Sequence, residues 1–153
     1  MSFIESIKTV LSKYAVFNGR ARRSEYWWYV LAYGIVYTVL YVALVAPGLA
    51  EYSAATSEYL MAGDAAAPMP AMPGSLTTGY IILSIAGLAL LLPTLGVTVR
   101  RLHDTGKSGF WVLIGLILFV GQIILIVFTA ANGTPGPNQH GPDPKAVAQP
   151  QAV

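Results

Sequence analysis

Three long stretches of this chain carry no charged side chain, and they constrain its fold more than any other feature. The stretches are residues 26–46, 79–99 and 110–131, and they contain 21, 21 and 22 residues. An α-helix rises about 1.5 Å per residue, so each stretch is long enough for a helix of about 30 Å, the thickness of a bilayer's hydrocarbon core. The sequence therefore predicts three transmembrane helices.

The composition agrees with this prediction. Hydrophobic residues make up 55% of the chain and charged residues 10%, whereas an ordinary soluble domain has about 25% charged residues. The formal charge of +2 and the pI of about 8.9 are modest and do not indicate nucleic acid as a partner. The chain has no cysteine, which excludes disulfides, thiolate catalysis and cysteine-ligated metal. We expect an all-α integral membrane protein.

Residues 1–17 have the spacing of an amphipathic helix. Their apolar side chains recur near i, i+3, i+4 and i+7, as Phe3, Ile4, Ile7, Val10, Leu11 and Tyr14. This pattern favours a helix that lies on the membrane surface before the first span. A cleaved signal peptide is the alternative for the first apolar stretch, but the stretch is too long and Glu5 and Glu25 precede it.

The basic residues lie at the ends of the apolar stretches and predict the orientation of the chain. Residues 1–25 hold five of them, residues 47–78 hold none, and residues 100–109 hold three. Segments rich in lysine and arginine remain in the cytoplasm. We therefore expect the N-terminus and residues 100–109 in the cytoplasm and residues 47–78 outside it.

The side of the membrane on which the C-terminal tail lies depends on the third apolar stretch. A single crossing over residues 110–131 puts the tail outside, and this is the arrangement we expect. A break near Gly121 would instead give a re-entrant pair of about 11 residues each, too short to cross alone, and would return the tail to the cytoplasm.

The three connecting segments differ in kind. Residues 47–78 form an outer loop rich in Ala and Pro, which predicts a flexible tether with a helical turn near residues 52–61. Residues 100–109 form a short basic turn, in which Gly106 ends the second helix in the left-handed conformation and Ser108 caps the third. Residues 132–153 are rich in Pro and Gly and should be extended and unpacked.

The basic segments also predict a binding site. The first span begins and the second ends on the same side, so their arginines converge if the two helices are neighbours, with Glu25 paired to one of them. Such a site suits a phosphate, a lipid headgroup or an acidic segment of a partner. In the alternative, the basic residues only orient the helices and attract anionic lipid. The candidate residues are Arg20, Arg22, Arg23, Arg100, Arg101, His103 and Asp104.

Other chemistry has little support in the sequence. His103 and Asp104 are adjacent and point in different directions on a helix, and the second histidine is His140. We expect Asp104 to pair with Arg101 or to cap the turn. The sequence predicts no catalytic residue, no metal site and no cofactor.

Polar side chains within the apolar stretches form a further pattern. Tyrosines step by four along the first stretch, at positions 29, 33, 37 and 41. Hydroxyls in the bilayer interior need hydrogen-bond partners from another helix. We expect Tyr33 and Tyr37 to meet Thr94, Thr98 and Gln122 inside the bundle, as packing contacts or, alternatively, as a polar transport route.

Three separated motifs connect the chain with a known family. They are Phe17, Gly19, Arg20, Arg22, Arg23, Glu25 and Trp27; then Arg100 to Asp104 with Ser108 and Trp111; then Gly133 to Gly136, Asn138 and Gly141 to Pro144. In these residues the chain resembles the bacterial inner-membrane family catalogued as domain of unknown function 805. His140 departs from the family pattern, which has Tyr or Phe there. The resemblance implies a small multi-span inner-membrane protein without an agreed reaction.

These observations leave three hypotheses for the function. The first is a non-enzymatic membrane module that binds anionic lipid or a protein partner through its basic cytoplasmic face. The second is a small transporter or channel component that uses the Tyr, Thr and Gln side chains. The third, an enzyme acting on a phosphorylated lipid, has the least support, because the sequence lacks a nucleophile and base at recognisable spacing. Membrane lipids, other membrane proteins or further copies of the chain are the expected partners.

Overall fold

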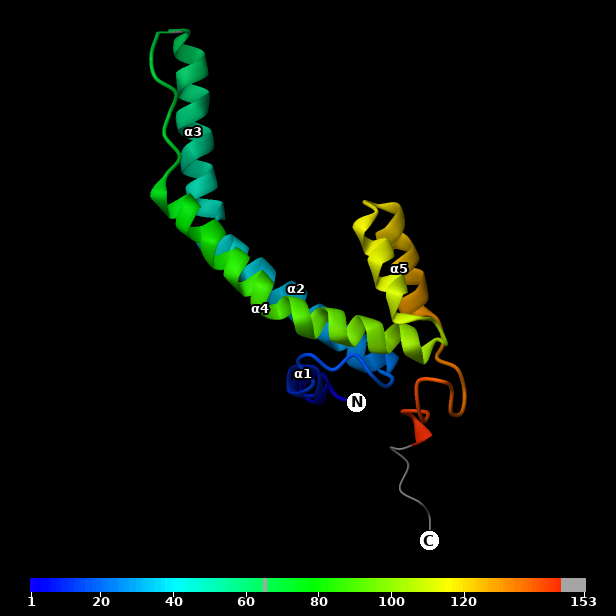
Figure 1. The fold of residues 1–153 in the computed structure, drawn as a ribbon. Coiled ribbons are helices and arrows are strands. Elements are labelled where there is room, and N and C mark those ends of the chain that lie inside the picture. The colour runs from blue at the N-terminus through cyan, green and yellow to red at the C-terminus, as the bar shows by residue number, and fades with distance from the viewer. Residues whose placement is uncertain (65, 147–153) are drawn as a thin grey trace. The chain divides into compact units, whose positions relative to one another are not determined.

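The computed structural model describes residues 1–64 and 66–146, and all of its elements are helical (Figure 1). They are α1 (Phe3–Ser12), α2 (Arg23–Leu44), α3 (Ala46–Ala62), α4 (Gly74–Asp104), the 3-10 helix η1 (Gly109–Leu116) and α5 (Val120–Ala130). No strand forms in these residues, and their one extended pairing is an isolated bridge between Asn138 and Gly141. The predicted all-α class is confirmed.

The chain divides into two compact units, which we describe separately. The first unit comprises Met1–Ala32 and Leu90–Val153, and the second comprises Tyr33–Ala89. In the first unit, Val10 of α1, Ala21, Tyr29 of α2 and Val97 of α4 form one buried cluster. In the second unit, Val45, Leu76 and Leu83 form another.

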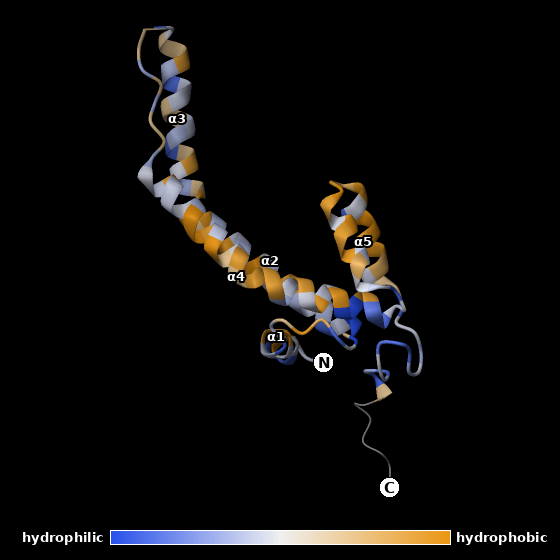
Figure 2. Cartoon of the chain, viewed as in Figure 1, coloured by the Kyte–Doolittle hydropathy of each residue, from blue (hydrophilic) through white to orange (hydrophobic). Residues whose placement is uncertain are grey.

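Two of the helices are long and apolar enough to cross a membrane, namely α2 and α4, while α5 is apolar but shorter. In α2 and α4 only 6% and 28% of the most apolar window is buried inside the protein. The central helix of a soluble protein would be mostly buried, so this large exposed apolar surface is suited to lipid. Figure 2 shows hydrophobic residues along α4 and α5 and hydrophilic residues where α4 ends.

The helix α1 begins with a capping box. The amide of Glu5 donates to the Ser2 hydroxyl at 3.3 Å, and the amide of Ser2 donates to the Glu5 carboxylate at 2.8 Å. These bonds satisfy donors that a helix start leaves free. The helix buries Ser6 and Val10, while Ile4 stays 62% exposed.

The segment expected to form the outer loop, residues 47–78, differs from the predicted flexible tether. Most of its first half is the helix α3, which has Pro47 in its first turn and ends at Gly63, whose φ is +64°. Proline is well suited to the first turn of a helix, and glycine adopts the left-handed conformation after its end without steric cost. Between these signals the segment is rich in Ala, Glu, Leu and Met, which favour helix.

The predicted basic turn over residues 100–109 is shorter in the structure, because α4 continues through Asp104. Arg100, Arg101, His103 and Asp104 therefore lie on the last helical turns. The two expected stop and start signals are confirmed. Gly106 has a φ of +75°, and the Ser108 hydroxyl accepts from the amide of Phe110 at 3.4 Å.

The third apolar stretch is a hairpin, not the single helix predicted over residues 110–131. Its two arms, η1 and α5, pack against each other (Figure 1). The Trp111 and Phe128 rings meet edge to face with centroids 5.4 Å apart. Gln122 Nε2 donates to the Gly115 carbonyl at 2.8 Å, which joins the arms again.

The reason for the break is a close approach at Gly121. A Cβ at this position would overlap the Ile114 carbonyl oxygen and lie 2.7 Å from its carbon, so only glycine fits. Just before it, Phe119 has a φ of +61°, a conformation that is rare for an aromatic residue. The turn therefore depends on contacts between the two arms.

Candidate functional site

Two buried ion pairs meet at Asp104 in the first unit. Arg20 Nε lies 3.0 Å from Asp104 Oδ1, and Arg101 Nη1 contacts Oδ2. The three side chains are between 1% and 5% exposed. Each carboxylate oxygen faces its own guanidinium, one from Arg101 on the same helix and one from Arg20, so Asp104 holds α4 to the residues before α2.

A third ion pair joins Arg100 and Glu25. Arg100 Nη1 lies 2.7 Å from Glu25 Oε1, with the two side chains 1% and 6% exposed. The backbone amide of Ala21 also donates to the Arg100 carbonyl at 2.9 Å. Arg100 Nε and Nη2 are buried without a hydrogen-bond partner. A buried guanidinium donor without a partner costs stability, so these two atoms offset part of what the ion pair contributes.

Residues 132–144 of the tail pack against the arginines, which differs from the predicted unpacked segment, of which residues 147–153 lie outside the described residues. Arg20 Nη1 donates to the Gly136 carbonyl at 2.6 Å and Nη2 to that of Thr134. Arg22 Nε donates to the Pro144 carbonyl at 2.8 Å, and Arg23 Nη2 donates to Asn132 Oδ1 at the same distance. The reason is that guanidinium groups satisfy carbonyls that an extended proline-rich chain leaves free.

Arg101 secures the end of the hairpin as well. Its Nε donates to the Thr129 carbonyl at 2.9 Å, and its Nη2 contacts the Ala131 carbonyl. These are carbonyls from the last turn of α5, which a helix end leaves unpaired. One side chain thus connects α4, Asp104 and the point at which the tail begins.

Gly133 lets the tail pass directly over Asp104. A Cβ at Gly133 would lie 2.8 Å from the Asp104 carboxyl carbon and overlap one of its oxygens. The Thr134 amide and hydroxyl contact the Asp104 backbone carbonyl, at 2.8 and 3.2 Å. Gly133 therefore leaves room for the Asp104 carboxylate and its ion pairs with Arg20 and Arg101.

The two histidines stack on each other. The His103 and His140 rings are 3.8 Å apart between centroids and nearly parallel, with 5° between planes. His103 Nδ1 is 3.2 Å from the Gly19 carbonyl, and Asn138 Nδ2 donates to the His103 carbonyl at 3.0 Å. His140 thus places a flat ring against His103 at the position where it departs from the family pattern.

Asp143 fixes the turn of the tail. Its carboxylate accepts from the Lys145 amide at 2.8 Å and from the Gly136 amide at 3.2 Å. The Lys145 amide, followed by the Gly136 amide and nearby Arg20, lowers the pKa of the Asp143 carboxyl below its ordinary value of 3.8. The group is therefore ionised at neutral pH, as these contacts require.

The predicted intramembrane contacts have different partners. Thr94 meets Tyr29 at 2.9 Å between hydroxyl oxygens, and Thr98 donates to the Thr94 carbonyl of its own helix. Gln122 pairs within the hairpin. In the second unit, the Tyr33 and Tyr37 rings stack with centroids 5.6 Å apart. Tyr29 was not among the expected intramembrane contacts, although it belongs to the same tyrosine series.

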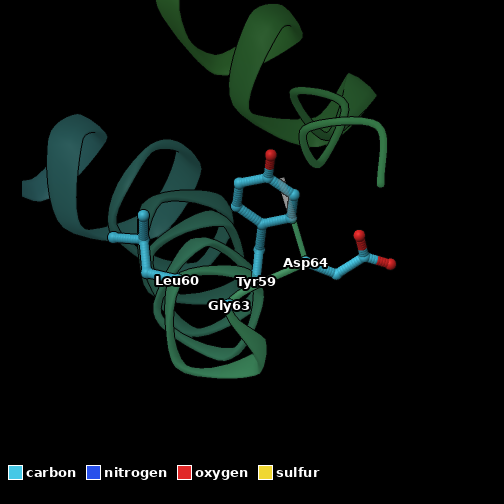
Figure 3. A pocket seen from close by; sticks show the side chains of 4 residues that line it. All are labelled: Tyr59, Leu60, Gly63 and Asp64. Atoms are coloured by element: carbon cyan, nitrogen blue, oxygen red, sulfur yellow. The ribbon is translucent and has the colours of Figure 1, made fainter. Parts of the chain in front are cut away.

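The described residues, 1–64 and 66–146, also bear on metal binding and on hollows in the surface. Among these residues no group of three or more His, Cys, Asp and Glu is arranged to hold a metal ion. In the second unit, Tyr59, Leu60, Gly63 and Asp64 line a hollow of about 250 Å³ (Figure 3). Its one charged group is Asp64, so we assign it no role.

The fold and the ionic cluster define a helical protein with two helices apolar enough to span a membrane and a buried charge network at the end of one of them. The chain belongs to the family described as a protein of unknown function, DUF805, which matches residues 14–142. The predicted resemblance is thus confirmed.

Two relatives from Escherichia coli (strain K12) carry names that describe them as inner membrane proteins. The chain is 40% identical to inner membrane protein YhaH over 136 residues, which cover 89% of this chain and 93% of the relative. It is 36% identical to inner membrane protein YhaI over 137 residues, which cover 90% and 92%. No solved structure matches the chain. Together with the apolar helices, these relatives support an inner-membrane protein.

Proposed function

We propose that this protein is a non-enzymatic inner-membrane module that binds anionic lipid through a basic cytoplasmic face. The observation that carries the proposal is the division of charge between the two units. The first unit has all nine basic residues and four carboxylates, for a formal charge of +5, while the second has three carboxylates. Basic segments next to a bilayer attract anionic headgroups by about 1 kcal/mol per side chain.

The proposed topology has two spans, α2 and α4, with the N-terminus in the cytoplasm. Charge asymmetry supports this orientation, since lysine and arginine favour the cytoplasmic side. We take the η1–α5 hairpin as re-entrant, because the 11 residues of α5 reach only about 16 Å, half of the hydrocarbon core. The proposal therefore differs from the expected three spans and returns the tail to the cytoplasm.

The arginines have two roles in this proposal. Arg20, Arg100 and Arg101 are buried in ion pairs and hold the cytoplasmic end of the protein together. Lipid contact falls to side chains that remain exposed, Lys8 and Arg23 above all. The helix α1 lies at the membrane surface with Phe3 and Ile4 toward the lipid.

The test compares the purified protein in two kinds of nanodisc. With phosphatidylglycerol present, we expect a higher melting temperature than in phosphatidylcholine alone, and a gain that falls as salt is added, because exposed charges are screened. The double variant Lys8→Gln and Arg23→Gln should lose about 2 kcal/mol of the lipid-dependent stabilisation that this rise in melting temperature reports.

Glu58→Gln is the matched control, because it changes an exposed charge on α3 in the second unit. This variant should keep the whole rise in melting temperature that phosphatidylglycerol produces. Equal melting temperatures in both lipids would contradict the proposed function.

A further inference from the structure

A charged pocket lies in the first unit, apart from the Asp104 ion pairs. It has a volume of about 420 Å³, within the usual size of small-ligand sites. It is lined by Met1, Glu5, Thr9 and Lys13 from α1 and the residues on either side of it, by Arg22 and Glu25 from the start of α2 and the residue before it, and by Pro144 from the tail. The pocket thus combines two cationic and two anionic side chains.

Existing contacts hold three of the four charged side chains in place. Glu25 is fixed by Arg100 at 2.7 Å and is only 6% exposed. The Glu5 carboxylate is held by the Ser2 amide at 2.8 Å. Arg22 binds the Pro144 carbonyl through Nε and Nη2. Groups that are fixed in advance bind a ligand with little further loss of conformational entropy.

The mixture of charges selects the chemical class of ligand. A simple anion would face the carboxylates of Glu5 and Glu25, and a simple cation would face Lys13 and Arg22. A ligand that carries both charges within a few ångströms can pair with both groups. A phosphoethanolamine group has this character, with an anionic phosphate and an ammonium that donates hydrogen bonds.

The surroundings of the pocket indicate that such a ligand comes from the bilayer. On the same helix Ile4 is 62% exposed and Leu11 is 43% exposed, and the nearby Trp28 ring is 40% exposed. Trp28 contacts Phe3 edge to face with centroids 5.7 Å apart. Aromatic rings beside aliphatic side chains are typical of the headgroup level of a membrane.

We propose that this pocket binds the zwitterionic headgroup of an aminophospholipid, with the phosphate on Lys13 and Arg22 and the ammonium on Glu5 and Glu25. The site goes beyond the proposed function, because adhesion to an anionic surface needs neither a pocket nor a carboxylate. Surface adhesion depends on Lys8 and Arg23, and the pocket depends on Lys13. The two proposals can therefore fail independently.

The experiment titrates the full chain in detergent micelles with short-chain phosphatidylethanolamine and measures binding by calorimetry. We expect saturable binding of one lipid per chain and weaker binding of phosphatidylcholine, whose quaternary ammonium donates no hydrogen bond. Lys13→Gln should weaken binding about tenfold, the effect of one charge-assisted hydrogen bond. Thr9→Leu, which fills the pocket wall without changing charge, should also weaken it.

Lys145→Gln provides the matched control, because Lys145 is an exposed lysine of the first unit outside the pocket lining. It should leave phosphatidylethanolamine binding unchanged. The proposal is overturned if phosphatidylcholine or phosphatidylglycerol binds as tightly, or if Lys145→Gln and Lys13→Gln have the same effect. Equal or tighter binding of soluble glycerophosphoethanolamine would overturn the assignment to a lipid.

Discussion

Replacing Asp104 with asparagine should lower the free energy of unfolding by about 3–5 kcal/mol, the cost of removing one partner from a buried ion pair. Asp104 pairs with both Arg20 and Arg101, so the change leaves two buried guanidinium groups without a counter-charge. The tail should loosen as well, because Arg20 also holds the Thr134 and Gly136 carbonyls. Thermal unfolding in detergent and the rate of proteolysis after residue 131 measure the two effects.

A double-mutant cycle separates this explanation from a general loss of packing. In the Arg20→Gln background one of the two guanidinium groups is already gone, so Asp104→Asn should cost less than it does alone. Glu58→Gln, an exposed carboxylate on α3, should change stability by less than about 0.5 kcal/mol. Equal costs of Asp104→Asn in both backgrounds would show that the ion pair with Arg20 contributes nothing.

Gly121→Ala is expected to open the hairpin, with a destabilisation of about 2–4 kcal/mol. The added Cβ would overlap the Ile114 carbonyl oxygen, and backbone atoms cannot move aside as a flexible side chain can. The Gln122 bond to Gly115 and the Trp111 contact with Phe128 should then be lost. Hydrogen exchange of peptides from residues 109–130 should rise in the variant.

Gly34→Ala is the control for this substitution, since nothing lies within 4 Å of its added Cβ in the middle of α2. Alanine favours helix more than glycine, so this variant should be neutral or more stable by up to about 1 kcal/mol. If Gly121→Ala behaved in the same way, with unchanged exchange in residues 109–130, the hairpin would not depend on the close approach at Gly121.

Local patterns in the sequence predicted where the two long helices lie, although α4 extends beyond the predicted stretch at both ends. Charge-free stretches mark most of α2 and α4, and Gly106 and Ser108 end and begin elements as expected. These features depend on residues close in sequence, where hydropathy and capping preferences act. The expected approach of the two basic segments is seen for Arg20 and Arg101, which meet at Asp104, and Glu25 pairs with Arg100 as expected of one arginine.

The third apolar stretch was harder to predict, because both a hairpin and a single span satisfy the same hydropathy pattern. What decides between them is a contact across the turn, where Gly121 meets the Ile114 carbonyl and Phe119 adopts a φ of +61°. Neither feature is visible in periodicity. A glycine in an apolar run is compatible with a helix, although it weakens it.

The packing of the tail was missed for a similar reason. Its proline and glycine content indicates an extended chain, which is correct locally but does not say what binds the free carbonyls. The acceptors at Thr134, Gly136 and Pro144 pair with arginines more than 100 positions earlier. The available signal was the motif in the tail, because a glycine such as Gly133 allows the chain to pass close to another group.

The most direct test of this account asks on which side of the membrane the tail lies. The chain has no native cysteine, so single cysteines replacing Ser12, Ser57 and Lys145 can be probed in intact cells with a thiol reagent that does not cross the membrane. If the hairpin is re-entrant and the arginines hold the tail, only position 57 should react, and positions 12 and 145 should react once the membrane is permeabilised. Labelling of position 145 in intact cells would contradict the account.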